Sequence, residues 1–182
     1  GLGSAAIARV YGIMNGTCNY ILTRMGTDGI GFDECLRDAQ ELGYAEADPT
    51  FDIEGYDTAH KLAILTSLCF ETEIAADQIF VEGITRITEV DIRVAGDLGY
   101  KIKLLGIAER TPEGMIEQRV HPTLVRKTSA IANVDGVLNA IALETNHVPE
   151  LLLAGPGAGG LAMAASVLSD ILDIARDTSV PP

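Results

Sequence analysis

The stretch GYAEADPTFDIEGYDTAHK, residues 43–61, carries the most informative pattern in the chain. Five acidic residues and a single lysine fall between positions 46 and 61. Pro49 disfavours helical backbone at Asp48, so the stretch opens on an extended turn. Helical spacing follows, and it places Asp57 and Lys61 four positions apart on one helix face. A turn rich in carboxylates beside such a pair suits a small polar ligand that carries an amino group.

The patterns on either side of this stretch predict helices in the first half of the chain. Residues 6–14 alternate as a strand, and a helix follows from Thr17, as its N-cap, to Met25, with Gly26 as its end. The next two helices are predicted from Phe32 to Leu42, with Gly43 as the stop, and from Asp52, as a cap, to about Cys69. Thr88 and Asp91 resemble a capping box that opens a short helix ending at Gly99.

Strands dominate the second half. The predicted strands are 79–84, 100–110, 115–120, 137–144 and 150–154, with a turn at 111–114 and a strand break at His121-Pro122. A long apolar helix over 161–176 closes the pattern, and its apolar stripe indicates a core or interface face. Helices first and antiparallel strands later predict an α+β fold. In it, a mixed, largely antiparallel sheet is covered on one face by helices.

Composition excludes several classes of protein. The chain has 182 residues, enough for one domain with a core, and its net charge of −13 repels nucleic-acid phosphates. No apolar run reaches the roughly 20 residues of a membrane span, and no signal peptide opens the chain, so a cytoplasmic location is expected. Cys18, Cys35 and Cys69 are predicted to be reduced core thiols. The three histidines share no ligand spacing, so no metal site is expected.

Four segments together resemble homoserine dehydrogenase over nearly the whole chain. They are YGIMNGTCNYIL at 11–22, the stretch at 43–61, HPTLV at 121–125 and GPGAG at 155–159. The resemblance is to that family's substrate-binding and dimerisation region, of the type found as the C-terminal domain of glyceraldehyde-3-phosphate dehydrogenase.

The resemblance implies a division of the chain. Residues 5–154 would form the substrate-binding and dimerisation domain. The glycine loop and helix at 155–177 would return toward a nucleotide-binding half that we expect to be missing. Residues 1–4 resemble a tag or join, and residues 178–182 the start of a linker.

The family's reaction is the NAD(P)-dependent interconversion of aspartate semialdehyde and homoserine. By resemblance, Glu46 would hold the substrate ammonium, and Asp52 and Tyr44 would line the same pocket. Gly16 and Thr17 stand at a helix start, where free N–H groups favour the substrate carboxylate.

The resemblance also assigns the catalytic and cofactor-side residues. Lys61 would face the reacting oxygen and Asp57 would orient it. Gly157, Ala158 and Gly159 would lie near the cofactor. The complete enzyme would use NAD or NADP, but this chain alone is expected to bind no cofactor, to be inactive and to form a homodimer through its sheet. Cys18 stands where the family commonly has threonine, and Ala162-Met163-Ala164 where a Pro-Thr pair is usual.

Plainer interpretations exist for each of these residues. Asp57 and Lys61 could be an exposed helical ion pair, Asp52 only a cap, and Tyr44 a core side chain. Gly155, Gly157 and Gly160 fit the dinucleotide pattern G-x-G-x-x-G, but no further strand with an acidic residue follows. At the level of function, the alternatives are a non-catalytic homodimerisation module and a related amino-acid semialdehyde dehydrogenase.

Overall fold

The computed structural model describes residues 6–176, and a six-stranded sheet organises that part of the chain in the order β2-β4-β3-β1-β5-β6. The strands are β1 Ile7–Ile13, β2 Phe80–Val81, β3 Tyr100–Arg110, β4 Ile116–Arg126, β5 Leu138–Thr145 and β6 Leu151–Pro156. Every neighbouring pair is antiparallel except β2 and β4, which are parallel. The predicted mixed, largely antiparallel sheet is confirmed.

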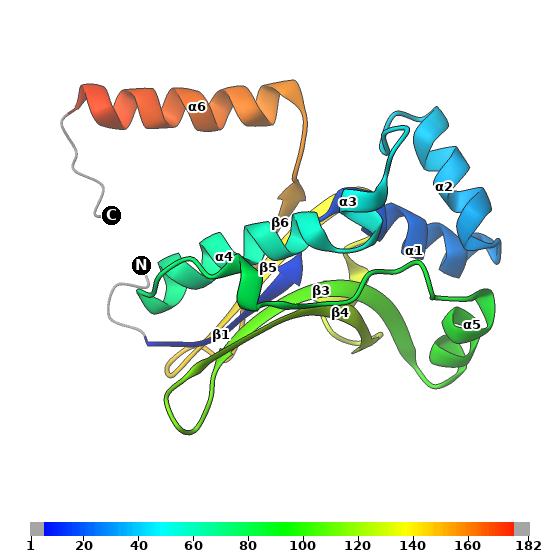
Figure 1. Cartoon of the computed structure of the whole chain (residues 1–182), viewed down its shortest axis with the longest axis horizontal. Coiled ribbons are helices and arrows are strands. Elements are labelled where there is room, and N and C mark those ends of the chain that lie inside the picture. The colour runs from blue at the N-terminus through cyan, green and yellow to red at the C-terminus, as the bar shows by residue number, and fades with distance from the viewer. Residues whose placement is uncertain (1–5, 177–182) are drawn as a thin grey trace.

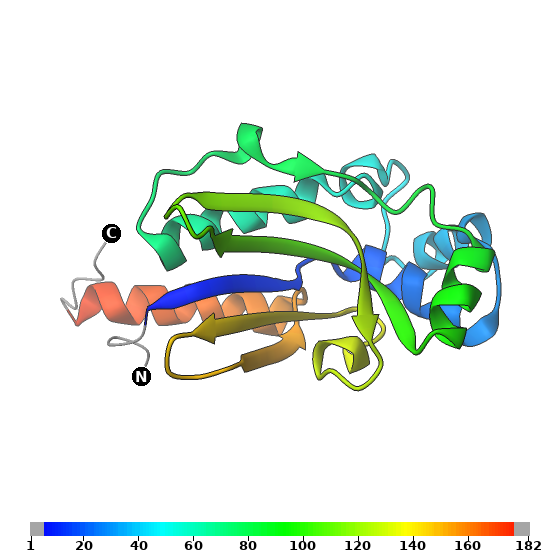
Figure 2. The same cartoon turned by 90° about the horizontal axis from the view of Figure 1, so that it is seen from below.

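The first strand lies in the middle of this sheet. Val10 of β1 stands opposite Ala108 of β3 on one side and Leu143 of β5 on the other. β3 pairs with β4 and β5 with β6, each pair joined directly along the chain. β1 therefore links two hairpins that come much later in the sequence (Figure 2).

The helices gather on one face and at one end of the sheet (Figure 1). α3 and α4 lie across the face, and α1, α2 and α5 group at its end, while α6 lies apart. Their bounds are α1 Gly16–Asp28, α2 Phe32–Glu41, α3 Thr50–Ile53, α4 Tyr56–Phe70, α5 Glu89–Asp97 and α6 Gly160–Ala175. Two 3-10 turns are added, η1 at Ala76–Gln78 and η2 at Ile131–Asn133. The α+β prediction, with helices on one face, is confirmed.

Strand alternation divides the core between the two faces of the sheet. Val10, Leu104 and Ala108 point to the helices and pack with residues such as Ile21 and Leu62. Their neighbours Tyr11 and Ile107 point to the other face, where η2 contributes Ile131 and Ala132. Side chains alternate between faces because successive strand residues point in opposite directions.

Several predicted boundaries are confirmed in detail. Gly43 follows the C-cap of α2, and the N–H groups of Gly43 and Tyr44 donate to the carbonyls of Gln40 and Ala39, which is a Schellman ending. Thr88 and Asp91 form both bonds of a capping box at the start of α5. The strand predicted over 100–110 is β3.

Three helix predictions are corrected. α1 is capped by Asn15, whose Oδ1 accepts from the Cys18 N–H, and not by Thr17. It ends at Gly29 rather than Gly26. The single helix expected from Asp52 is two helices, so Asp52 lies inside α3 instead of capping a long helix. Gly55 separates them with φ of 87°, a left-handed conformation that glycine adopts without a Cβ penalty.

Two strand predictions are corrected as well. The strand expected over 79–84 is reduced to Phe80–Val81. β4 does not break at His121-Pro122 but continues to Arg126, with Pro122 opposite Leu104. The prolyl residue is tolerated because β2 pairs only with Arg119 and Val120, so β4 is an edge strand beyond that point.

Two of the sequence predictions concern the ends of the chain. The possible tag at 1–4 and the linker start at 178–182 lie outside the described residues. Within the described residues, no helix is both long enough and apolar enough to cross a membrane.

Gly83 offers a test of how the segment after β2 packs. A Cβ at this position would lie 2.2 Å from the carbonyl oxygen of Ile53 and 2.4 Å from the Cα of Glu54. We expect Gly83→Ala to lower the free energy of unfolding by about 2–3 kcal/mol, because backbone must move to make room. Denaturant unfolding measures this change. Gly160→Ala, where a Cβ meets nothing within 4 Å, is the matched control and should leave the free energy of unfolding unchanged. Equal losses in the two variants would contradict this packing.

Candidate functional site

A polar pocket of about 290 Å³ opens where the start of α1 meets α3, α4 and the end of β6. It collects eight of the residues singled out by sequence, which come from three separate segments of the chain. They are Gly16, Thr17, Tyr44, Asp52, Asp57, Lys61, Gly157 and Ala158. The fold thus brings residues about 140 positions apart into one cavity.

Asn15 is the connecting residue of this pocket. Its Nδ2 donates to Oδ1 of Asp52 at 2.7 Å and to Oδ2 of Asp57 at 2.9 Å, while its Oδ1 caps α1. One amide therefore holds two carboxylates of like charge and fixes the helix start beside them. The Asn15 side chain is buried, so these bonds are sheltered from water.

Lys61 stands at the rim of the pocket with its ammonium group fixed from two sides. Its Nζ lies 2.7 Å from Oδ2 of Asp57 and 3.1 Å from the carbonyl oxygen of Met14. Half of the lysine side chain is exposed, whereas that of Asp57 is mostly covered. The i,i+4 spacing predicted this pair, and the bond to Met14, the residue after β1, adds a second fixed contact for the ammonium.

Thr17 ties α1 to the turn that follows α2. Its hydroxyl lies 2.7 Å from the carbonyl oxygen of Tyr44 and 3.1 Å from Oδ2 of Asp52. A hydroxyl has a single proton, so the shorter contact takes it. Oδ2 of Asp52 then keeps free capacity to accept a hydrogen bond from a ligand.

Cys18 forms part of the pocket's support. Its Sγ donates to the carbonyl oxygen of Asp52 at 3.2 Å, and its side chain is fully buried. Burial, with the nearby charge of Asp52 acting in the same direction, raises the pKa of this thiol far above its usual value. Cys18 is therefore an uncharged packing residue under the acidic turn.

Two of the sequence candidates do not line the pocket. Glu46 is exposed, and its main-chain oxygen accepts from Nε2 of Gln40 at 3.0 Å. Gly159 is the N-cap of α6 and lies outside the lining. Tyr44, two positions before Glu46, does reach the pocket and also stacks against the ring of Tyr20, with centroids 5.1 Å apart.

Sequence reasoning missed four lining residues, Asn15, Gly43, Val137 and Asn139, of which Gly43 was predicted only as a helix stop. Asn15 had a usable signal, because asparagine immediately before a glycine and a threonine is a strong N-cap candidate. Val137 and Asn139 had none, since they flank the start of a strand far away in sequence. Asn139 donates to the same Met14 oxygen as Lys61, at 3.4 Å.

A second, apolar cavity of about 280 Å³ adjoins the polar pocket. Lys61 and Asn139 line both cavities and so form the boundary between them. The apolar walls come from β1, α4 and β5 through Ile13, Leu65 and Ile141. The charged pocket therefore opens onto a surface suited to a flat apolar group. Among residues 6–176, no group of three histidine, cysteine or carboxylate side chains could hold a metal ion.

Comparison with known proteins gives concordant results. The family model for homoserine dehydrogenase matches residues 1–172. The homoserine dehydrogenase of Neisseria gonorrhoeae is 49% identical over 176 residues, which is 97% of this chain and 40% of that protein. The enzyme of Pseudomonas aeruginosa is 47% identical, over all of this chain and 42% of its own length.

Solved structures agree with this result. A homoserine dehydrogenase from Thiobacillus denitrificans superposes with a TM-score of 0.93 at 48% identity, over 96% of this chain and 40% of that one. A hyperthermophilic archaeal homoserine dehydrogenase in complex with NADPH superposes with a TM-score of 0.79 at 27% identity, over 96% of this chain and 49% of that one.

The α+β fold and these matches define the class: a domain found in a family of oxidoreductases. More specifically, the chain belongs to the homoserine dehydrogenase family. It spans about 40% of the length of the curated relatives quoted above.

Asn15 provides the test of the site's internal electrostatics. Asn15→Asp keeps an oxygen that can cap α1 but replaces the Nδ2 donor with a third carboxylate facing Asp52 and Asp57. We expect the free energy of unfolding at pH 7 to fall by about 2–4 kcal/mol, since two partly buried carboxylates lose their shared donor and gain a like-charged neighbour. Denaturant unfolding gives the value.

Asn15→Ser is the matched control, because serine keeps a capping oxygen and adds no charge. The free energy of unfolding of the serine variant should fall by about 1 kcal/mol. If the aspartate variant were no less stable than the serine variant, the bridging role of Asn15 would be wrong.

Proposed function

We propose that the polar pocket binds L-homoserine and L-aspartate 4-semialdehyde, and that this chain is the substrate-binding region of an NAD(P)-dependent homoserine dehydrogenase. The observation that carries the proposal is the arrangement of Asp52, Lys61 and the start of α1 around one cavity. A small amino acid with an oxygen at its far end needs three matching groups. They are an anion for its ammonium, N–H donors for its carboxylate and a proton donor for its oxygen.

The two charged ends of the substrate are matched by different elements. At the start of α1, the N–H groups of Gly16 and Thr17 are free of intrahelical partners, and both residues line the pocket. This helix end favours the carboxylate. For the ammonium, the family resemblance assigns Glu46, and Asp52 lines the pocket with a free carboxylate oxygen. Both carboxylates are kept as candidates.

Lys61 and Asp57 are assigned to the reacting end. An ammonium that faces the aldehyde oxygen polarises the carbonyl group and donates a proton as the alkoxide forms, and it accepts that proton in the reverse direction. Asp57 fixes the direction of the ammonium through the 2.7 Å contact. In this role Asp57 positions Lys61 and does not touch the substrate oxygen.

The cofactor is assigned to the apolar cavity beside Lys61 and to the loop at Gly157 and Ala158. A Cβ at Gly157 would lie 1.9 Å from Nδ2 of Asn139, so this stretch of backbone packs closely against the boundary between the two cavities. Ile13, Leu65 and Ile141 offer the apolar wall that a nicotinamide ring requires. The bound NAD or NADP supplies the hydride. Without a positioned hydride donor the isolated chain is inactive, although its pocket is complete enough to bind.

Homoserine binding tests this proposal directly. Titration calorimetry should show that L-homoserine binds the chain, and that 4-hydroxybutyrate, which lacks only the ammonium, binds at least about tenfold more weakly. Glu46→Gln and Asp52→Asn are compared in the same way. The variant that has lost the ammonium partner will bind homoserine about tenfold more weakly while its affinity for 4-hydroxybutyrate stays unchanged.

Glu41→Gln is the control for overall charge, since Glu41 is an exposed residue at the end of α2. Equal binding of homoserine and 4-hydroxybutyrate would contradict the assigned ammonium site. Absence of homoserine binding would favour the alternative function, a homodimerisation module without a substrate site.

We also propose that the chain forms a homodimer through the sheet face opposite α4. Support comes from the arrangement of the fold, because η2 is the only described helix that lies over this face of the sheet (Figure 2). Light scattering should then give a mass of twice 19.3 kDa. A monomeric wild-type chain would refute this assembly.

A further inference from the structure

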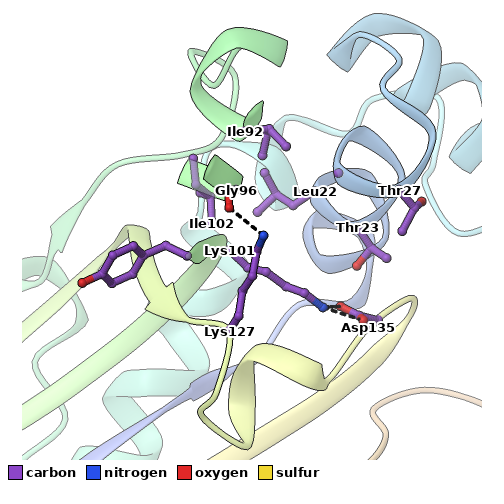
Figure 3. Close-up of a pocket in the computed structure, with 11 residues that line it drawn as sticks. Leu22, Thr23, Thr27, Ile92, Gly96, Lys101, Ile102, Lys127 and Asp135 are labelled. Carbon is purple, nitrogen blue, oxygen red and sulfur yellow. Dashed lines mark hydrogen bonds and ion pairs between the residues drawn. The ribbon is translucent and has the colours of Figure 1, made fainter. Parts of the chain in front are cut away.

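A separate cavity of about 220 Å³ lies between α1, α5 and the start of β3, lined by a different set of residues from the acidic pocket (Figure 3). α1 and α5 supply two walls, and β3 and the segment after η2 supply the others. None of the proposed substrate or cofactor residues lines it. The function proposed above therefore leaves this cavity without a role.

Three of the four lysines in the chain converge on this cavity, although the chain carries a net charge of −13. Lys101 and Lys127 line it directly, and Lys103 does not line it but binds the lining residue Asp135. Nζ of Lys101 lies 2.9 Å from one oxygen of Asp135, and Nζ of Lys103 lies 2.8 Å from the other. Two ammonium groups thus share a single carboxylate.

The third lysine has no carboxylate partner among the described residues. Nζ of Lys127 donates to the carbonyl oxygen of Gly96 at 2.7 Å, which leaves two of its N–H bonds available. Asp28 is the last residue of α1 and follows Thr27, which lines the cavity. The carboxylate of Asp28 is bound to Arg24 and does not line the cavity. The cavity therefore holds more positive than negative charge.

Asp135 already accepts hydrogen bonds from two lysines, so its single negative charge cannot balance the positive charge of all three. Burial alone would raise the pKa of Asp135, but the bonds from Lys103 and Lys101 lower it below its usual value. The carboxylate is therefore ionised at neutral pH, and its single charge is already shared by two ammonium groups. An anion that entered the cavity would meet Lys101 and Lys127 with positive charge still to be compensated.

The remaining wall of the cavity is formed by apolar side chains and by glycines. Leu22, Ile92 and Ile102 form one side, and Gly26 and Gly96 leave space where side chains would otherwise project (Figure 3). Thr23 and Thr27 add hydroxyl groups along α1. A ligand that fits must combine a compact aliphatic body with an anionic end.

We propose that this cavity binds a small organic carboxylate, with the carboxylate between Lys101 and Lys127 and the aliphatic body against Leu22, Ile92 and Ile102. The 220 Å³ of space suits a ligand of a few heavy atoms. The site is independent of the substrate pocket, and its existence does not depend on the function proposed above.

The test uses isobutyrate and its neutral isostere isobutyramide as probes of the ¹⁵N-labelled chain. Isobutyrate should shift the amide signals of Gly26 and Gly96, which line this cavity only, with an affinity in the millimolar range. Isobutyramide should produce no such shifts. Lys101→Met and Lys127→Met keep the aliphatic stems and should each weaken isobutyrate binding about fivefold or more.

Arg93→Met removes one positive charge from an exposed position of α5 outside the cavity and should leave the affinity unchanged. Lys127 is exposed, so its variant keeps the experiment informative even if Lys101→Met fails to fold. Equal binding of the two probes would overturn the proposal, as would unchanged affinity in the methionine variants. Shifts confined to Gly16 and Thr17 would also overturn it, because they would place the probe in the substrate pocket.

Discussion

The side-chain amide of Asn15 is the interaction on which the candidate site depends. One end of it terminates α1, and the other end holds Asp52 and Asp57 together. Two carboxylates this close repel each other unless a donor stands between them, and that repulsion grows as water is excluded. Because the same residue performs both tasks, the position of the helix start and the geometry of the acidic pair are set together.

Distant parts of the chain meet at this point because of the sheet. Met14, at the end of β1, offers its carbonyl oxygen to Lys61 of α4 and to Asn139 of β5. Asn19, one turn further along α1, donates to the carbonyls of Val134 and Leu138 and accepts from the buried ammonium of Lys103. These bonds attach the segment before β5 to α1. The pocket is therefore held by main-chain groups of the segments that meet at the centre of the sheet.

Features that are set by contacts between residues close in sequence could be predicted from the sequence. Gly43 as a helix stop and the Thr88–Asp91 capping box followed from backbone chemistry within a few residues, and both were confirmed. The break at Gly55 was missed because helical spacing continues on both sides of it. The run of β4 through Pro122 depends on how far β2 extends, which is a property of the sheet and not of β4 itself.

The candidate site could also be predicted only in part, because local patterns do not determine how distant segments pack. Eight candidates share a pocket because the motifs that carry them fold against one another. Spacing alone could not decide which side chains of the acidic turn face inward, so Tyr44 lines the cavity and Glu46 does not. The roles given to these residues stay predictions. Val137 and Asn139 were out of reach, since only the pairing of β5 with β1 brings them to the pocket.

The position of β1 has a consequence for how such a chain is synthesised. β1 is synthesised before both of its neighbours, since β3 and β5 follow only after about 90 and 130 further residues. Pairing between such distant segments is slow, because a long loop must close before any bond forms. Until β3 has been made, the apolar residues of β1 have no strand partner and are open to non-native contacts. The strand at the centre of the sheet can therefore reach its place only late in folding.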